Sequence, residues 1–350
     1  MGDIGTARGS AAAPNPIGAL VMDPLPPAQI APFARLAEQL GFGELWVPED
    51  YYFNAGISTA AIGLGATARI PVGIGITSAV VRHPAVLAME LATLAGAFPG
   101  RLLPGIGLGT PICLRQMGLE PPSPLATVRE CVTVVRRLLA GEEVSLQGRS
   151  FQLDRVRLVH PLPGPIPIYT GAMGPKMLQL CGEIADGNII GVSATPDIVR
   201  WSREQIAVGA RRAGRPFTHA CPVFVLYAVA PDRTAARAAI RGTLAFLLSV
   251  FPRNAYTEHY GCADELERIV ARGGPAAVAQ EMPEAWLDDF AVAGAPDECA
   301  ERIDRYLAAG ATSVIIAPQP ADQYAAQLEL TAREVFPRLR QPLREGVTNA

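Results

Sequence analysis

The sequence predicts an α/β fold of the (β/α)₈ TIM-barrel class with two inserted segments. Short apolar runs of strand length alternate with amphipathic helical patterns from about residue 17 to residue 340. Strict alternation of strands and helices is typical of a parallel sheet, and eight such units close a barrel. Of the 350 residues, 49% are hydrophobic and 18% are charged, which is enough apolar material for one large core. We therefore expect one barrel domain over residues 17–340, flanked by tails at residues 1–16 and 341–350.

The first four strand–helix units follow one another without interruption. Val72–Val80 is almost continuously apolar, as expected of a parallel strand buried on both faces. Pro84 opens the third helix at a position where its missing N–H costs nothing. The expected strands are Ile17–Asp23, Glu44–Asp50, Val72–Val80 and Arg101–Gly109, and the expected helices are Pro26–Leu40, Ile57–Ala68, the helix opened by Pro84, and Pro124–Ala140.

Two segments interrupt the second half of the chain. Residues 142–165 alternate apolar and polar side chains around Gly148, which predicts a hairpin-like insertion. Residues 251–293 carry several helical patterns and no clear strand. The remaining expected strands are Pro167–Ala172, Asn188–Ser193, Val223–Ala230 and Ser313–Pro318, and the helices are Pro175–Ile184, Asp197–Ala213, Asp232–Val250, Pro296–Ala309 and Tyr324–Phe336.

The main alternative to the barrel is an open, doubly wound parallel sheet. That fold normally carries a G-x-G-x-x-G turn after an early strand and an acidic residue further on. The glycines Gly105, Gly107 and Gly109 have a different spacing and belong to the fourth strand. The pattern therefore favours the barrel.

Composition and charge exclude several classes of protein. The net charge of −3 argues against a nucleic-acid partner, whose binders present a basic face. The first residues lack the basic and apolar regions of a signal peptide, and the apolar run Val72–Val81 is too short to cross a membrane. The six cysteines are scattered, with no metal or redox spacing. We expect a cytoplasmic protein with reduced thiols and no metal or membrane partner.

Charged side chains follow the first three strands, where a barrel holds its working residues. Asp23 ends the first strand, Glu49 and Asp50 end the second, and Arg82 follows the third. A carboxylate in a desolvating pocket can act as a general acid or base, so either Glu49 or Asp50 is a candidate for proton transfer. Arg82 is expected to hold a carboxylate, either that of a substrate or that of Glu49.

The turn after the fifth strand is the most specific local signal. It reads Thr170-Gly171-Ala172-Met173-Gly174-Pro175-Lys176, a strand end, a glycine-bearing turn and the first turn of a helix. Free backbone N–H groups, the positive end of the helix and a lysine together form an anion site, most naturally for phosphate. An ordinary strand–helix turn is the alternative reading.

Several segments together resemble the luciferase-like family of flavin- and deazaflavin-dependent oxidoreductases. They are GFGELWVPED (41–50), RHPAVLAMELATL (82–94), GRLLPGIGLG (100–109) and, most strongly, PIYTGAMGPKMLQLCGEIADG (167–187). Within the family, the chain looks closest to the methylenetetrahydromethanopterin reductase branch, whose members use the deazaflavin coenzyme F420.

The resemblance implies a barrel with an insertion near the seventh strand and a cofactor phosphate at Met173–Lys176. It places the cofactor ring at the end of the third strand, with a non-proline cis peptide near Thr77, Ser78 and Ala79, and it implies that Gly107 and Gly109 leave room for the ring. Family members are commonly dimers or tetramers, so a homo-oligomer is implied as well. The pattern departs from relatives at Glu49-Asp50, where Asp-His is frequent, and at Thr110, where some relatives have Glu.

Three functions therefore remain in view. The first is an F420-dependent oxidoreductase that transfers a hydride to or from an electron-poor C=C or C=N bond of a small or peptide-like organic substrate, with reduction of the substrate as the favoured direction. The second is an FMN-dependent monooxygenase of the luciferase type. The third is a non-catalytic barrel that only binds a ligand, since a fold alone does not prove an activity.

Overall fold

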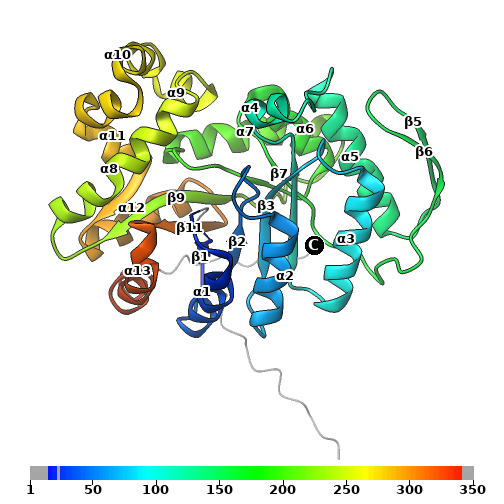
Figure 1. Cartoon of the computed structure of the whole chain (residues 1–350), viewed down its shortest axis with the longest axis horizontal. Coiled ribbons are helices and arrows are strands. Elements are labelled where there is room, and N and C mark those ends of the chain that lie inside the picture. The colour runs from blue at the N-terminus through cyan, green and yellow to red at the C-terminus, as the bar shows by residue number, and fades with distance from the viewer. Residues whose placement is uncertain (1–14, 22–23, 341–350) are drawn as a thin grey trace, which may run out of the picture.

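The computed structural model describes residues 15–21 and 24–340. The predicted tails and the candidate Asp23 therefore lie outside the described residues, apart from Asn15 and Pro16. The barrel strands and helices succeed one another in the expected order (Figure 1). The strands are β1 (Ile17–Leu20), β2 (Leu45–Val47), β3 (Val72–Ser78), β4 (Leu102–Gly107), β5 (Val144–Gln147), β6 (Gln152–Val156), β7 (Tyr169–Gly171), β8 (Gly187–Ile189), β9 (Pro222–Val229), β10 (Ala291–Gly294) and β11 (Ser313–Pro318). The helices are α1 (Pro27–Gln39), α2 (Gly56–Ala66), α3 (Pro84–Ala97), α4 (Pro111–Gln116), α5 (Pro124–Leu139), α6 (Pro175–Ile184), α7 (Pro196–Arg212), α8 (Arg233–Val250), α9 (Ala255–Tyr260), α10 (Ala263–Glu281), α11 (Glu284–Phe290), α12 (Pro296–Ala308) and α13 (Tyr324–Leu330).

The main sheet is parallel and closes on itself. Its strand order is β10-β9-β11-β1-β2-β3-β4-β7-β8. The two remaining neighbours, β8 and β9, are joined by backbone hydrogen bonds from Ile190 N–H to the Pro222 carbonyl (2.9 Å) and from Phe224 N–H to the Ile190 carbonyl (2.9 Å). Eight strands thus form the ring, which confirms the predicted TIM-barrel class.

The ninth strand corrects the prediction for residues 251–293. Helices α9, α10 and α11 fill most of that segment, but its end forms β10, which was not expected. Strand β10 pairs with the C-terminal half of β9, from Leu226 to Val229. Its four residues Ala-Val-Ala-Gly are too few and too small to show a strand period, because tertiary pairing rather than pattern selects their conformation.

The interior of the ring is a packed aromatic and aliphatic layer. Trp46 is fully buried, and its ring meets those of Tyr169 and Phe224 edge-on at centroid distances of 5.4 and 5.6 Å. Gly73 on the neighbouring strand leaves the space that the indole occupies, since a Cβ there would lie 2.3 Å from Trp46 Cε3. This layer closes the barrel from below and leaves space only at the C-terminal ends of the strands.

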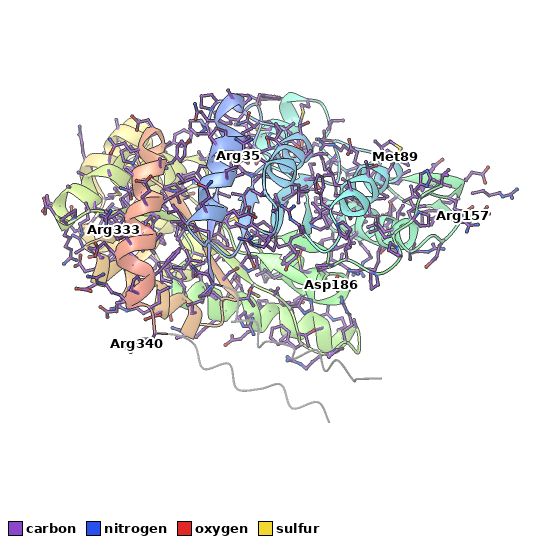
Figure 2. The ribbon with its side chains drawn as sticks, turned by 90° about the horizontal axis from the view of Figure 1, so that it is seen from below. Arg35, Met89, Arg157, Asp186, Arg333 and Arg340 are labelled. Carbon is purple, nitrogen blue, oxygen red and sulfur yellow. The ribbon has the colours of Figure 1, made fainter. Side chains whose placement is uncertain are left out.

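The insertions project from opposite ends of the molecule. The antiparallel pair β5–β6 extends beyond α3 and α5, while α9, α10 and α11 gather beside α8 at the other end (Figure 1). Arg157, just after β6, marks the tip of the first insertion in Figure 2. Within residues 15–21 and 24–340, no helix is long and apolar enough to cross a membrane.

The buried His219 makes stability depend on pH. It lies just before β9, with Nε2 3.4 Å from the Cys181 carbonyl, and Nδ1 has no partner among the described residues. Burial, and then the charge of Arg215, lower the pKa of His219, so the folded state binds a proton less readily than the unfolded state. This contribution to stability is therefore complete above the ordinary histidine pKa and is lost as the pH falls through the lowered value.

We expect His219→Gln, which keeps a donor near the Cys181 carbonyl, to flatten this acid-side loss. Urea unfolding between neutral and mildly acidic pH checks the expectation. The exposed His160, changed to Gln, is the matched control and should leave the pH slope unaltered. An unchanged slope in His219→Gln would show that other groups cause the acid-side loss.

Candidate functional site

A cavity of about 300 Å³ opens at the mouth of the barrel, beside the C-terminal ends of β2, β4, β7 and β8, and it is also lined by residues of β3 and β9. This is the face on which barrel enzymes hold their ligands. Glycines supply much of the wall, so the backbone itself borders the space. The lining residues are Glu49, Asp50, Gly75, Ile76, Leu108, Gly109, Thr110, Gly171, Ala172, Met173, Ile189, Gly191 and Phe224.

The floor of the cavity is formed by β3 and its glycine-bearing neighbours. A non-proline cis peptide joins Gly75 to Ile76, directly before the segment Thr77–Ala79 near which the resemblance placed such a bond. The Ile76 side chain lies over Gly107 and Gly171, where added Cβ atoms would come within 3.0 and 2.9 Å of it. The Gly107 position therefore leaves room for Ile76, and Ile76 in turn presents a flat apolar surface to the cavity.

Thr77, Ser78 and Ala79 are not among the residues that line this cavity. All three are buried, and the two hydroxyl groups donate to backbone carbonyls of the β4 segment, Thr77 to Gly105 (2.9 Å) and Ser78 to Leu108 (2.7 Å). The residues of β3 that do line the cavity are Gly75 and Ile76.

Glu49 and Arg82 form a buried, two-pronged ion pair. The Arg82 Nη1 and Nη2 atoms donate to the two Glu49 oxygens at 2.7 and 2.9 Å, and the Glu49 side chain is only 3% exposed. Glu49 also accepts from Gly56 N–H (3.1 Å) and from the Tyr51 hydroxyl (3.3 Å). These four hydrogen bonds hold the carboxylate in one orientation, so this geometry suits a positioning role better than proton transfer.

The Glu49–Arg82 pair and burial shift the pKa values of the neighbouring titratable groups. Burial by itself would lower the pKa of Arg82, but its hydrogen bonds to Glu49 and the charges of Glu49 and Glu90 raise it overall. Burial and the Glu49 carboxylate raise the pKa of Tyr51, which therefore stays protonated and can donate to Glu49. Burial likewise raises the pKa of Glu90, whose Oε2 lies 3.3 Å from Arg82 Nε.

Asp50 differs from Glu49 although the two are adjacent in sequence. It is exposed and lines the cavity, directly before the cis Tyr51–Tyr52 peptide. Both residues border the cavity, but Glu49 is buried whereas Asp50 is exposed. Of the three residues predicted for chemistry, Asp50 is therefore the carboxylate that solvent and a ligand in the cavity both reach.

The predicted anion turn is divided between two cavities. Ala172 and Met173 line the barrel mouth, whereas Thr170 is buried below it and contacts the Gly187 carbonyl and Asn188. Gly174 is the residue before the first turn of α6, and a Cβ there would meet no atom within 4 Å. Pro175 opens the helix and has no N–H, and the exposed Lys176 lines a separate cavity between α5, α6 and α7.

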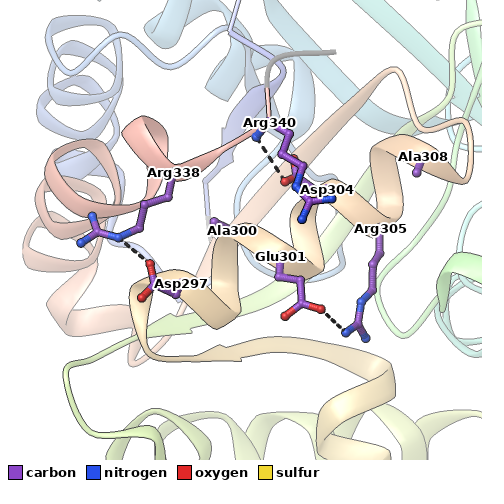
Figure 3. Close-up of a pocket in the computed structure, with 8 residues that line it drawn as sticks. All are labelled: Asp297, Ala300, Glu301, Asp304, Arg305, Ala308, Arg338 and Arg340. Atoms are coloured by element: carbon purple, nitrogen blue, oxygen red, sulfur yellow. Dashed lines mark hydrogen bonds and ion pairs between the residues drawn. The ribbon is translucent and has the colours of Figure 1, made fainter. Parts of the chain in front are cut away.

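A further cavity of about 400 Å³ lies on the outer surface of α12 (Figure 3). Its charged side chains pair with one another, as Arg338 does with Asp297 (2.7 Å) and Arg305 with Glu301 (2.6 Å). None of the residues around it ends a barrel strand. It is therefore not the candidate active site, despite being larger. The lining residues are Asp297, Ala300, Glu301, Asp304, Arg305, Ala308, Arg338 and Arg340.

Sequence reasoning missed Gln319, the residue that follows β11. Its side chain is 5% exposed; Oε1 accepts from the Thr243 hydroxyl of α8 (3.0 Å), and Nε2 has no partner among the described residues. Ile315 and Ala317 of β11 face the barrel interior, and Gln319 continues that side of the strand at the mouth. Working residues of a barrel follow the C-terminal ends of its strands. Applying this rule to the last strand, as was done for the second, would have identified Gln319.

Metal and thiol chemistry find no support in the part of the chain that is described. No group of three or more His, Cys, Asp or Glu side chains there is arranged to hold a metal ion. All six cysteines are buried and unpaired, and burial raises the pKa of Cys131, Cys181 and Cys299 to about 12. Buried, protonated thiols are structural rather than reactive.

The closed parallel ring with a cavity at its strand ends defines a (β/α)₈ barrel whose candidate site lies on the face where barrel enzymes hold their ligands. Residues 8–313 match the luciferase-like monooxygenase family, and the chain belongs to this family.

Individual relatives narrow the comparison. The 5,10-methylenetetrahydromethanopterin reductase of Methanolobus tindarius is 30% identical over 316 residues, covering 89% of this chain and 96% of the relative. An F420-dependent glucose-6-phosphate dehydrogenase of Nakamurella multipartita is 28% identical, with 91% and 95% covered. Among solved structures, the coenzyme F420-dependent tetrahydromethanopterin reductase of Methanopyrus kandleri superimposes with a TM-score of 0.82 at 25% identity, covering 94% of this chain and all of that one (100%). An FMN-containing Baeyer–Villiger monooxygenase of Pseudomonas putida shares the fold at 18% identity, with a TM-score of 0.70 and 93% and 98% covered.

Proposed function

We propose that this chain is an F420-dependent oxidoreductase that transfers a hydride between the deazaflavin and an electron-poor C=C or C=N bond of a small organic substrate. The observation that carries the proposal is the glycine-walled cavity at the strand ends, in a chain whose relatives include F420-dependent enzymes. When bound, F420 supplies the carbon that gives or takes the hydride. The residues of the chain bind the cofactor and the substrate, orient them toward each other, and transfer the proton.

The cavity fits a flat ring that carries a phosphate. Gly171 and Gly191 border it without side chains, and a Cβ at Gly191 would meet no atom within 4 Å. Gly109 has φ +95°, a conformation that side chains disfavour, and it brings its backbone to the cavity wall. Ile76 and Phe224 provide apolar faces below. This arrangement leaves a slot between backbone walls, which suits a tricyclic ring.

The phosphate belongs at the beginning of α6 in this proposal. The turn Ala172–Pro175 leads from the cavity to the positive end of the helix, and the backbone N–H groups there are not used by the helix itself. The open space beside Gly174 allows an anion to approach the backbone. Lys176, the residue after Pro175, contributes positive charge, although its side chain lines the separate cavity between α5, α6 and α7.

The substrate and its proton are assigned to the remaining part of the mouth. Asp50 is our candidate for proton transfer, because it lines the cavity and is exposed, whereas Arg82 and the Tyr51 hydroxyl both hold Glu49. The Gln319 Nε2 group, which has no partner among the described residues, lies on the side of the ring formed by β9 and β11. A hydrogen-bonding group of the substrate would satisfy it, since a buried unpaired amide is costly.

Binding of the two possible cofactors tests the proposal directly. The purified protein is titrated with F420 and, separately, with FMN, while its intrinsic fluorescence is measured. We expect a micromolar or tighter dissociation constant for F420 and much weaker binding of FMN. Preferential binding of FMN would favour the luciferase-type monooxygenase instead. Binding of neither cofactor would favour the non-catalytic barrel.

Filling the slot should block the cofactor. We expect Gly191→Val to weaken F420 binding roughly tenfold or more, because its methyl groups enter the cavity, and tenfold corresponds to about 1.4 kcal/mol. Gly164→Val is the matched control, since this exposed glycine also has no atom within 4 Å of an added Cβ and lies outside the cavity. Equal affinities of the two variants would exclude this cavity as the ring site.

A further inference from the structure

A cavity of about 240 Å³ lies between α5, α6 and α7, and along α6 it extends from Lys176 to Glu183. Four charged side chains line it. Arg129 comes from α5, Lys176 and Glu183 from α6, and Arg212 from the end of α7. Since α6 is the helix that begins at the proposed phosphate turn, this charged cavity lies directly beyond that turn.

Cationic groups outnumber carboxylates in this cavity. Glu183, with a side chain 13% exposed, pairs with both Arg129 and Arg212, the latter at 3.1 Å. Arg212 donates in addition to Gln179 Oε1 at 3.2 Å. Lys176 has no ion-pair partner among the residues that the structure describes. One carboxylate therefore orients two guanidinium groups, and the cavity keeps a positive balance toward solvent.

The two cavities are connected by the start of a single helix. Met173 lines the barrel mouth and Lys176 lines the charged cavity, only three positions further along the turn. A ligand whose phosphate rests at Gly174 can therefore continue over the end of α6 toward Arg129 and Arg212. The half-exposed guanidinium groups, 49% and 60% accessible, remain available to it.

We propose that this charged cavity binds the chain of carboxylates that extends from the phosphate of F420. The inference rests on the proposed function, because the oligoglutamate tail belongs to that cofactor and FMN has none. Arginine forks pair with carboxylates through two parallel hydrogen bonds, and a lysine adds a point charge at the entrance. The cavity thereby contributes affinity and distinguishes F420 from FMN without touching the reacting ring.

Cofactor species that differ only in the tail test this proposal. We expect F420 with a long glutamate tail to bind roughly tenfold more tightly than F420 with no glutamate at low salt, since several exposed ion pairs each add a small contribution. High salt should remove most of the difference by screening. Equal affinity for the two species at low salt would overturn the tail site while leaving F420 dependence intact. Failure of both species to bind would instead contradict the proposed function.

Substitutions assign the effect to these residues. Arg212→Gln and Arg129→Gln should each reduce the preference for the long tail several-fold, and leave the affinity for F420 without glutamate nearly unchanged. Glu183→Gln should increase the preference, because it removes the opposing carboxylate. Arg211→Gln is the matched control, an exposed arginine at the preceding position of α7 that does not line the cavity. A tail preference that survives in both Arg212→Gln and Arg129→Gln would place the tail elsewhere.

Discussion

Replacing Gly209 with Ala should lower the free energy of unfolding by about 3 kcal/mol, although Ala is the better helix former. Gly209 lies within α7, where it crosses α6, and a Cβ there would be 1.7 Å from the Gln179 carbonyl oxygen and 2.6 Å from the carbonyl carbon. Gly182 makes the reciprocal approach, with a Cβ position 2.0 Å from the Ile206 carbonyl oxygen. Both contacts are with backbone atoms, so no side chain can rotate away and the two helices must separate.

Urea unfolding of Gly209→Ala and of Gly242→Ala measures this cost against a matched control. Gly242 lies inside α8, is exposed, and an added Cβ there meets no atom within 4 Å. We expect this control to gain about 0.5–1 kcal/mol through helix propensity alone. If Gly209→Ala proved as stable as the wild type, the close approach of α6 and α7 would be incorrect.

The same substitution should weaken cofactor binding at a distance. Helix α6 carries the proposed phosphate turn at its first residues and the close crossing with α7 further along. A shift of α6 that relieves the clash at Gln179 therefore also displaces Gly174. F420 affinity of Gly209→Ala, measured at a temperature where the variant remains folded, should fall more than that of Gly242→Ala.

The architecture was predictable because each strand and helix of the barrel shows its own pattern of apolar residues along the sequence. The near-continuous apolar run of β3 and the proline at the start of α3 predict their elements without tertiary information. Strand β10 could not be found in this way, since its small residues carry no alternation and depend on pairing with β9. The order of elements is thus a local property of the sequence, whereas the ninth strand is not.

The site was predictable in position but not in detail. The strand-end rule identified the neighbourhoods of Glu49 and Met173, which do line the cavity. It left open whether Arg82 would hold a substrate carboxylate or Glu49, and it could not show that Asp50 is exposed, because that depends on how the β2–α2 loop folds back. Nor could it show that the Lys176 side chain lines a cavity other than the barrel mouth, since a turn of known sequence can direct a long side chain to either side.

Removing the guanidinium of Arg82 should have a comparably large effect on stability. We expect Arg82→Met to lower the free energy of unfolding by about 3 kcal/mol near neutral pH, because it leaves the Glu49 carboxylate buried without its main partner. Gly56 N–H and the Tyr51 hydroxyl remain, but two neutral donors do not balance a buried charge. Arg82→Lys should lie between the wild type and Arg82→Met, since an ammonium group cannot reproduce the fork.

A double-mutant cycle separates the pair from its surroundings. Glu49→Gln alone leaves Arg82 with Glu90 as a remaining partner at 3.3 Å and with solvent at 19% exposure, so its cost should be smaller than that of Arg82→Met. The double variant Glu49→Gln/Arg82→Met should recover part of the stability lost in Arg82→Met, because no unpaired charge remains in the interior. Purely additive losses would mean that the two side chains do not interact in solution. Strong coupling would instead make the pair the brace that holds the loop carrying Asp50 at the edge of the cavity, which is the role that the bidentate contact assigns to it.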